Sequence, residues 1–280
     1  MKELYFDREA RIALALVLAV VVLAVSLSKA PTTFSISVKT QYAGFRASPA
    51  HRARWYFDNA EMKRGPVGTM EPLTGAIKVM PGALVSLERV GSGPLRLRVK
   101  TSGDAVAALV NPVGQAPFDV VGQLVVVAQE TGDRHSTVLP FIGADLELGA
   151  EITNAENPTP VLLLGGSVTL LAHTMTGEQR YDAGKVALDL GDSIALDEVG
   201  DAAGILSIGA HADLAATVRV IARSLRVNRY GALGYEVYAT PLVRLQKDTA
   251  LQALWGSALL VFGLLAKLGK KAADEKGKNA

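Results

Sequence analysis

The pattern of apolar and polar residues divides the chain into an apolar segment near each end and a long patterned stretch between them. The central stretch alternates apolar and polar residues with a period of two, as in residues 34–39 (FSISVK) and 95–100 (LRLRVK). Such alternation is typical of strands that bury one face. Uninterrupted apolar runs at 124–128 and 161–164 are typical of strands buried on both faces.

Turn-forming sequences separate these predicted strands. Glycine occurs with Ser, Pro, Asp or another Gly at 91–94, 131–133, 165–166 and 190–192, and after Arg and Tyr at 229–231. Short strands at this spacing predict a mainly β fold, a β-sandwich or jelly-roll-like domain over residues 31–248. A proline-bearing stretch at 111–117 is the best candidate for a seam, and the sequence does not decide between one β subdomain and two.

Residues 211–228 (HADLAATVRVIARSLRVN) fit both a helix and a strand. A helix would place three arginines on one face. A strand would point Val218, Val220 and Ala222 inward, and the alternation would then need a bulge before Leu225. We favour a short loop followed by a long bent strand.

The apolar segment near the N-terminus, Ile12–Ser28, is a run of seventeen uncharged residues. A helix of this length covers about 25 Å, close to the roughly 30 Å hydrocarbon core of a bilayer. Arg11 and Lys29 can reach the interface from its two ends. Because the run is longer than the apolar region of a signal peptide, we expect an uncleaved transmembrane helix rather than a cleaved leader.

The second apolar segment, Thr249–Ala266, has eighteen uncharged residues and is followed by lysines. Its apolar residues occur on all sides of a helix, which favours a second transmembrane helix over a buried core helix. Each segment also contains two small residues four positions apart, a spacing that permits close packing with another helix. These predicted transmembrane packing residues are Ala15, Ala19, Ala253 and Ser257.

Charges beside the two segments predict their orientation. Residues 1–11 contain three basic residues and the tail 267–280 contains five lysines. Basic residues flanking a span tend to stay in the cytoplasm, so we expect both termini there and the central domain outside. The chain has no cysteine and no usable N-glycosylation sequon. We therefore expect a bacterial inner-membrane protein with a periplasmic domain.

The central charges are unevenly distributed. Residues 31–100 hold eleven basic against four acidic residues, a net of +7. Residues 101–200 hold three against fourteen, a net of −11, and residues 201–249 a net of +2. Basic parts near the anchors would face anionic lipid and leave the acidic part distal. Alternatively, the oppositely charged parts pair across the sheet.

Basic residues alternate with aromatic residues in the segment 43–66. This composition is typical of a surface that contacts a membrane or a protein partner. The alternative is a strand whose aromatic side chains fill the core while its arginines face water. The predicted contact residues are Arg46, Arg52, Arg54, Trp55, Tyr56, Phe57, Lys63 and Arg64.

No catalytic, cofactor or metal site is predicted. An acidic run around a Gly–Asp turn has the oxygen ligands that calcium prefers, but it lacks the EF-hand pattern and fits a solvated turn better. It comprises Asp189, Asp192, Asp197, Glu198 and Asp201. The four histidines, His51, His135, His173 and His211, lack the spacing of metal ligands.

These observations favour a membrane-anchored scaffold or accessory subunit of a bacterial cell-envelope complex, with no catalytic activity of its own. Its expected partners are the membrane and other membrane or envelope proteins, including a second copy of itself, but not nucleic acid. Two other functions stay open. One is a periplasmic glycan- or lipid-binding module, and the other is an envelope hydrolase whose residues meet only in the fold.

Overall fold

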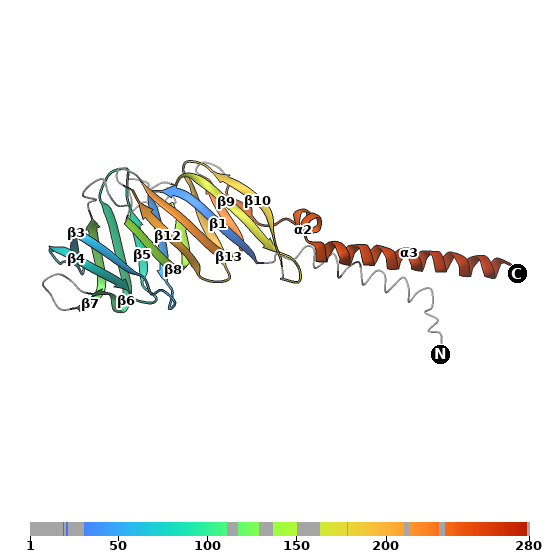
Figure 1. The fold of residues 1–280 in the computed structure, drawn as a ribbon, viewed down its shortest axis with the longest axis horizontal. Helices are drawn as coiled ribbons and strands as arrows, with labels where there is room; N and C mark the ends of the chain where they lie inside the picture. The colour runs from blue at the N-terminus through green and yellow to red at the C-terminus, as the bar shows by residue number, and fades with distance from the viewer. Residues whose placement is uncertain are drawn as a thin grey trace. The chain divides into compact units, whose positions relative to one another are not determined.

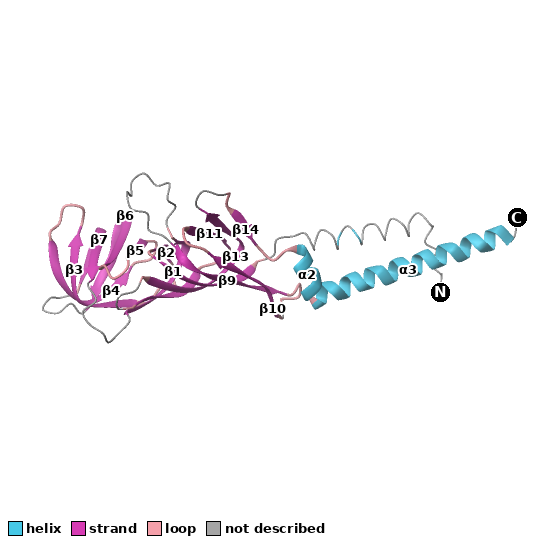
Figure 2. Cartoon of the chain, turned by 90° about the horizontal axis from the view of Figure 1, so that it is seen from above, coloured by secondary structure: helices cyan, strands magenta, loops and turns pink. Residues whose placement is uncertain are grey.

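The computed structural model describes residues 31–110, 117–128, 137–149, 163–177, 179–209, 213–229 and 233–278, together with Ala19 and Val21. The described chain before the C-terminal helices is mainly β, which confirms that prediction (Figure 2). The strands are β1 (Thr32–Thr40), β2 (Tyr42–Ala47), β3 (Arg54–Arg64), β4 (Met70–Val79), β5 (Leu84–Glu88), β6 (Leu95–Val110), β7 (Phe118–Ala128), β8 (Thr137–Leu148), β9 (Leu163–His173), β10 (Arg180–Leu188), β11 (Asp192–Glu198), β12 (Ala202–Ile208), β13 (Leu214–Arg229) and β14 (Tyr235–Val237). Two helices follow, α2 (Pro241–Lys247) and α3 (Thr249–Lys278).

The fourteen strands described belong to one hydrogen-bonded sheet (Figure 1). Their order is β10-β9-β1-β13-β11-β8-β2-β5-β6-β4-β3-β7, while β12 pairs with β13 and β8, and β14 pairs with β13. Four strands close a ring, because β4 pairs with β3 and β6, and β7 also pairs with β3 and β6. Within this ring, β3 and β7 each pair with a strand on both sides, so neither has an unpaired edge there.

Strand β13 confirms the interpretation of the ambiguous segment as a long bent strand. Buried positions alternate from Leu214 to Ala222. The pairing with β11 then skips Arg223, which makes this arginine the extra residue of a β-bulge. Ser224 and Leu225 are therefore both buried. The bulge shifts the alternation by one residue and keeps the second half of the strand facing the core.

Strands that are not neighbours in the sheet share one aromatic core. Trp55 of β3 is only 1% exposed, and its Nε1 donates to the carbonyl oxygen of Pro140 on β8 at 2.9 Å. Phe45 of β2 stacks on Phe141 of β8 with ring centroids 4.5 Å apart, and Trp55 meets Phe45 edge-on at 6.3 Å. The sheet therefore curls so that its inner face encloses these rings.

One predicted turn is wrong. Gly165 and Gly166 lie inside β9, next to β1 in the sheet, with φ angles of 141° and 152°. A Cβ atom at Gly166 would lie 2.4 Å from the carbonyl oxygen of Ser37. Glycine is needed there because the two backbones approach closely, and a pair of glycines in the sequence resembles a turn.

The chain divides into two compact units. One contains residues 31–171 and 184–238, which we call the β body. The other contains residues 1–30, the hairpin tip 172–183 and residues 239–280. The predicted seam lies outside the described residues except for Pro117. The strands on either side of it pair with each other, with Leu109 opposite Phe118, and both belong to the β body.

The second predicted span, 249–266, lies within α3. In the described part of the chain, no helix combines the length and the apolar character needed to cross a membrane. The first predicted span, Ile12–Ser28, lies outside the described residues except for Ala19 and Val21. The structure therefore does not support the two flanking spans, which stay predictions.

Candidate functional site

The starts of α2 and α3 are each held by a capping side chain. The Thr240 hydroxyl oxygen accepts a hydrogen bond from the amide of Val243 at 3.4 Å. Asp248 lies between the two helices, and its Oδ1 accepts from the amides of Ala250 and Leu251 at 3.0 and 3.1 Å. These side chains satisfy amides that have no partner within the first turn of a helix.

Asp248 also binds the tip of the β9–β10 hairpin. Its Oδ2 accepts from the backbone amide of Met175 at 2.7 Å, and the side chain of Asp248 is completely buried. One carboxylate therefore accepts three backbone hydrogen bonds, two from α3 and one from the hairpin. Both elements belong to the same compact unit.

Further contacts join the hairpin tip to α2. The Nζ atom of Lys247 donates to the carbonyl oxygen of Asp182 at 2.6 Å. Burial raises the pKa of the Tyr181 phenol, an effect that the charge of Arg244 opposes and that of Asp248 reinforces. Arg244 itself is buried. We call this group of contacts the hairpin–helix joint, formed by Met175, Tyr181, Asp182, Arg244, Lys247 and Asp248.

The first and last strands of the β body lie along the same edge of β13. Thr32 pairs with Ala222, and Val237 pairs with Leu225. Strand β11 occupies the opposite edge at both positions, so β1 and β14 share the remaining edge. At about 3.3 Å per residue, the two partners on β13 are roughly 10 Å apart. The chain therefore enters and leaves the β body at neighbouring positions.

Helix α3 exposes many apolar side chains. Its exposed large residues are Leu259, Leu260, Val261, Phe262 and Leu264, of which Leu260 is 70% exposed. Among the predicted packing residues, Ala253, Ser257 and Ala19 are exposed and Ala15 lies outside the described residues. The Ser257 hydroxyl donates to the carbonyl oxygen of Ala253 at 2.8 Å, so its polar group is satisfied within the helix.

The predicted contact residues of the segment 43–66 separate into two groups. Trp55 and Phe57 are 1% and 3% exposed, so they cannot belong to a contact surface as predicted. They point inward because β3 alternates, and their rings fill the core. Tyr56 is 61% exposed. Lys63 is half-buried, and the remaining members, Arg46, Arg52, Arg54 and Arg64, are exposed.

Two of these arginines form ion pairs. The Nε atom of Arg46 lies 2.8 Å from Oδ2 of Asp145, which joins the basic and acidic parts of the chain across β2 and β8. Arg64 binds both carboxylate oxygens of Glu71 and lies over the ring of Phe118 at 5.0 Å. The Arg46 pair favours the alternative that oppositely charged parts meet across the sheet. Both pairs are exposed, so each adds little stability.

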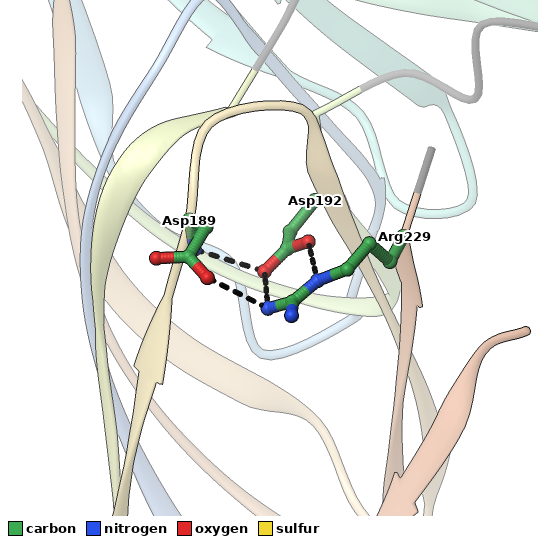
Figure 3. Close-up of polar contacts among 3 residues, drawn as sticks. All are labelled: Asp189, Asp192 and Arg229. Atoms are coloured by element: carbon green, nitrogen blue, oxygen red, sulfur yellow. Dashed lines mark hydrogen bonds and ion pairs between the residues drawn. The ribbon is translucent and has the colours of Figure 1, made fainter. Parts of the chain in front are cut away.

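Two residues of the acidic run, Asp189 and Asp192, bind an arginine. Figure 3 shows the guanidinium group of Arg229 in contact with the carboxylates of both. Its Nε lies 3.0 Å from Asp192, whose side chain is fully buried, and one terminal nitrogen lies 2.9 Å from Asp189. Gly191, with φ 84°, forms the turn between the two aspartates. Among the described residues, no group of three or more acidic or histidine side chains is placed to hold a metal ion.

Ser48, His51 and Asp201 come together but not as a catalytic triad. The Ser48 hydroxyl is hydrogen-bonded to the Asp201 carboxylate, not to the imidazole. Nδ1 of His51 accepts from the amide of Ile142 at 3.2 Å, and its buried Nε2 has no hydrogen-bond partner. Burial, and secondarily the charge of Arg52, lowers the pKa of His51. The histidine is therefore a neutral core residue that does not activate the serine.

The other histidines do not add to this group. His173 lies on β9, and His135 and His211 lie outside the described residues. The hairpin–helix joint was not predicted from the sequence. The only signals for it were a threonine and an aspartate at the two helix starts, which predict caps but not the contact with residue 175.

Comparison with known proteins gives no assignment for this chain. No protein-family model matches it, and no curated protein matches it.

Proposed function

We propose that this chain is a membrane-anchored scaffold or accessory subunit of a bacterial cell-envelope complex. Its terminal segments 12–28 and 249–266 anchor it in the inner membrane, with both termini in the cytoplasm. The β body lies in the periplasm, where it is positioned to dock other envelope proteins. No cofactor or catalytic group is part of this proposal.

The observation that carries the proposal is the position of Thr32 beside Val237 on β13. Both terminal segments continue from neighbouring positions on one side of β13, so both can reach a single membrane surface without spanning the domain. Two tethers from one place limit how far the domain can move. They raise its effective concentration near a membrane-bound partner, which suits positioning.

The exposed apolar side chains of α3 favour an apolar environment around this helix. Leu260, Phe262 and Leu264 are each at least 60% exposed and lie within five residues of one another. Side chains of this size lose about 1.5–3 kcal/mol each when they stay in water instead of being buried. Lipid would cover such residues on every side of the helix.

The hairpin–helix joint supports a positioning role. A buried carboxylate that holds both α3 and the hairpin tip ties the start of the anchor to a strand pair that continues into the β body. On the β body, the exposed Tyr56 with Arg52 and Arg54 is the proposed docking surface.

No observation favours the glycan-binding alternative in particular. Carbohydrate sites use exposed aromatic rings as platforms for sugars. Trp55 and Phe57 are buried, so only Tyr56 of this aromatic cluster is available on the surface.

Site-specific labelling tests the topology. The chain has no native cysteine, so each variant carries one reactive thiol. In intact cells with a permeable outer membrane, an impermeant maleimide should label Val67→Cys, whose native side chain is 91% exposed, but not Lys270→Cys. Both should react after the inner membrane is disrupted. Labelling of Lys270→Cys in intact cells, or a full-length chain that stays in solution without detergent, would overturn the anchored topology.

Photo-crosslinking tests the docking role. A photoreactive residue at Tyr56 should give a discrete protein adduct, which a matched control at Leu190, 66% exposed in the turn before β11, should not give. The Tyr56 adduct should involve one envelope protein that also co-purifies stoichiometrically in detergent. Equal adducts at both positions, or none, would contradict this docking surface.

A further inference from the structure

We infer that the N-terminal apolar segment 12–28 packs antiparallel against the exposed apolar surface of α3, so that the two tethers of one chain form a helical hairpin. This inference rests on the proposed membrane anchoring. In this arrangement the segment 12–28 covers apolar side chains of α3 that are exposed in the described structure. The two anchors then form one structural element.

The first support is the geometry of the β body. Thr32 lies on the same edge of β13 as Val237, with their partners about 10 Å apart. Residues 238–248, which include the short helix α2, lie between β14 and α3, and only residues 29–31 lie between the apolar segment and β1. Short connections at neighbouring positions give the two segments a high effective concentration for each other.

The second support is chain direction. The N-terminal segment runs toward the β body, whereas α3 runs away from it. If both follow the same axis, they must be antiparallel. Aligning Ser26 with Ala253 then places Ala19 level with Leu260, one of the most exposed apolar residues of α3.

The third support is the charge at the distal end. Residues 1–11 hold three acidic residues, Glu3, Asp7 and Glu9, and three basic residues, Lys2, Arg8 and Arg11, so this end carries no net charge, while Lys267, Lys270 and Lys271 follow the apolar part of α3. The antiparallel alignment places Glu9 level with Lys270 and Arg8 level with Lys271. Two copies of α3 in one membrane would instead be parallel and would bring like-charged lysines together. Charge therefore favours the segment of the same chain over a second copy.

Disulfide crosslinking tests this arrangement in membranes that contain the full chain. Ser26→Cys is combined with a cysteine at each of positions 252–255, which sample all sides of one helical turn. The control combines the same Ser26→Cys with positions 263–266, about 16 Å further along α3. A disulfide needs Cα atoms within about 7 Å, so the control positions are out of reach in the inferred alignment.

The native methionines provide the readout. Cyanogen bromide cleaves after Met62, Met70, Met80 and Met175, which separates fragment 2–62 from fragment 176–280. These fragments should stay joined without reductant for at least one of the positions 252–255, at a yield several-fold above every control position. The uncleaved product should keep the mass of a monomer.

Three results would overturn the inference. One is no yield above the control in a chain that stays membrane-bound and shows the proposed topology, which leaves the proposed function intact. Another is a crosslinked dimer, which would show that a second copy covers α3. The third is failure of membrane association itself, which would overturn the proposed function along with the inference.

Discussion

Asp248 accepts a hydrogen bond from the backbone amide of Met175 with one carboxylate oxygen while it caps α3 with the other. A separation of 73 residues in the chain thus becomes a contact of 2.7 Å. The Asp248 side chain therefore caps the start of α3 and also binds α3 to the tip of the β9–β10 hairpin. Its removal therefore affects two elements at once.

Replacing Asp248 with alanine should leave three backbone amides without their acceptor. We expect the free energy of unfolding to fall by about 2–4 kcal/mol, since each unsatisfied buried group and each lost cap costs about 1 kcal/mol or more. Hydrogen exchange of the Met175 amide should accelerate as well. Asp197→Ala, at an exposed aspartate, should change neither quantity. Unchanged exchange at Met175 in D248A would contradict the joint.

Replacing Asp192 with asparagine should destabilise the protein several times more than replacing Asp189 with asparagine. Asp192 is fully buried, pairs with Arg229 and also accepts from the amide of Asp189 at 2.9 Å, whereas the Asp189 side chain is 70% exposed. Exposed ion pairs contribute little and are screened by salt. Chemical denaturation of both variants at low and high salt measures the difference. Equal effects would mean that burial of Asp192 does not matter.

Acidification should destabilise the β body through His51. Burial lowers the pKa of His51 below its usual 6.5, so the folded state favours the neutral imidazole. The associated stability is fully present above pH 6.5 and is lost as the pH falls toward the lowered pKa. His51→Gln keeps an acceptor for the Ile142 amide but does not titrate, so its stability should depend less on pH between 7 and 5. If His173→Gln has the same effect, His51 is not the group responsible.

Alkaline titration should reveal the late ionisation of Tyr42. Burial, with Glu147 and Glu88 nearby, raises the pKa of Tyr42 to about 12. Its phenolate absorbance should therefore appear only near pH 12, and Tyr42→Phe should lower the absorbance gained near that pH by the contribution of one tyrosine. Because the pKa is raised on folding, the stability is present below pH 10 and is lost as the pH rises toward 12. A curve for Tyr42→Phe that loses absorbance near pH 10 would contradict this.

A charge in α3 should weaken membrane association. Leu260→Lys places a lysine where a membrane-spanning helix would meet the bilayer core, at a cost of about 2.5–3.5 kcal/mol, equivalent to a shift of roughly 100-fold in partitioning. Leu233→Lys is the matched control, because Leu233 is 96% exposed in a loop of the β body. Carbonate extraction followed by quantification of the soluble fraction measures the shift. Equal extraction of the two variants would argue against lipid around α3.

Local patterns predicted much of the fold. Alternation identified β1 and β6, and the bulge predicted before Leu225 is present in β13, at Arg223. These features depend only on residues close together in the sequence and on whether each side chain faces the core or the solvent. The same alternation explains why Trp55 and Phe57 are buried while Tyr56 is exposed. The sequence offered both interpretations of this segment, because it does not show which face of β3 is covered.

Contacts between distant residues were not predictable in this way. The acidic run suggested a cation site, but the cation it binds is Arg229 on a strand paired across the sheet. The glycines of β9 resembled a turn because their role depends on the approach of β1. The hairpin–helix joint depends on where Met175 lies in the fold, which no spacing near Asp248 indicates.

The neighbouring positions of Thr32 and Val237 also determine how the β body responds to mechanical load. Tension between the two ends of the chain passes through a short stretch of β13 and the ends of β1 and β14. The ring of β3, β4, β6 and β7 lies outside this path. Pulling on the two ends would therefore load the pairings of β1 and β14 with β13 first, and the far part of the sheet would keep its shape.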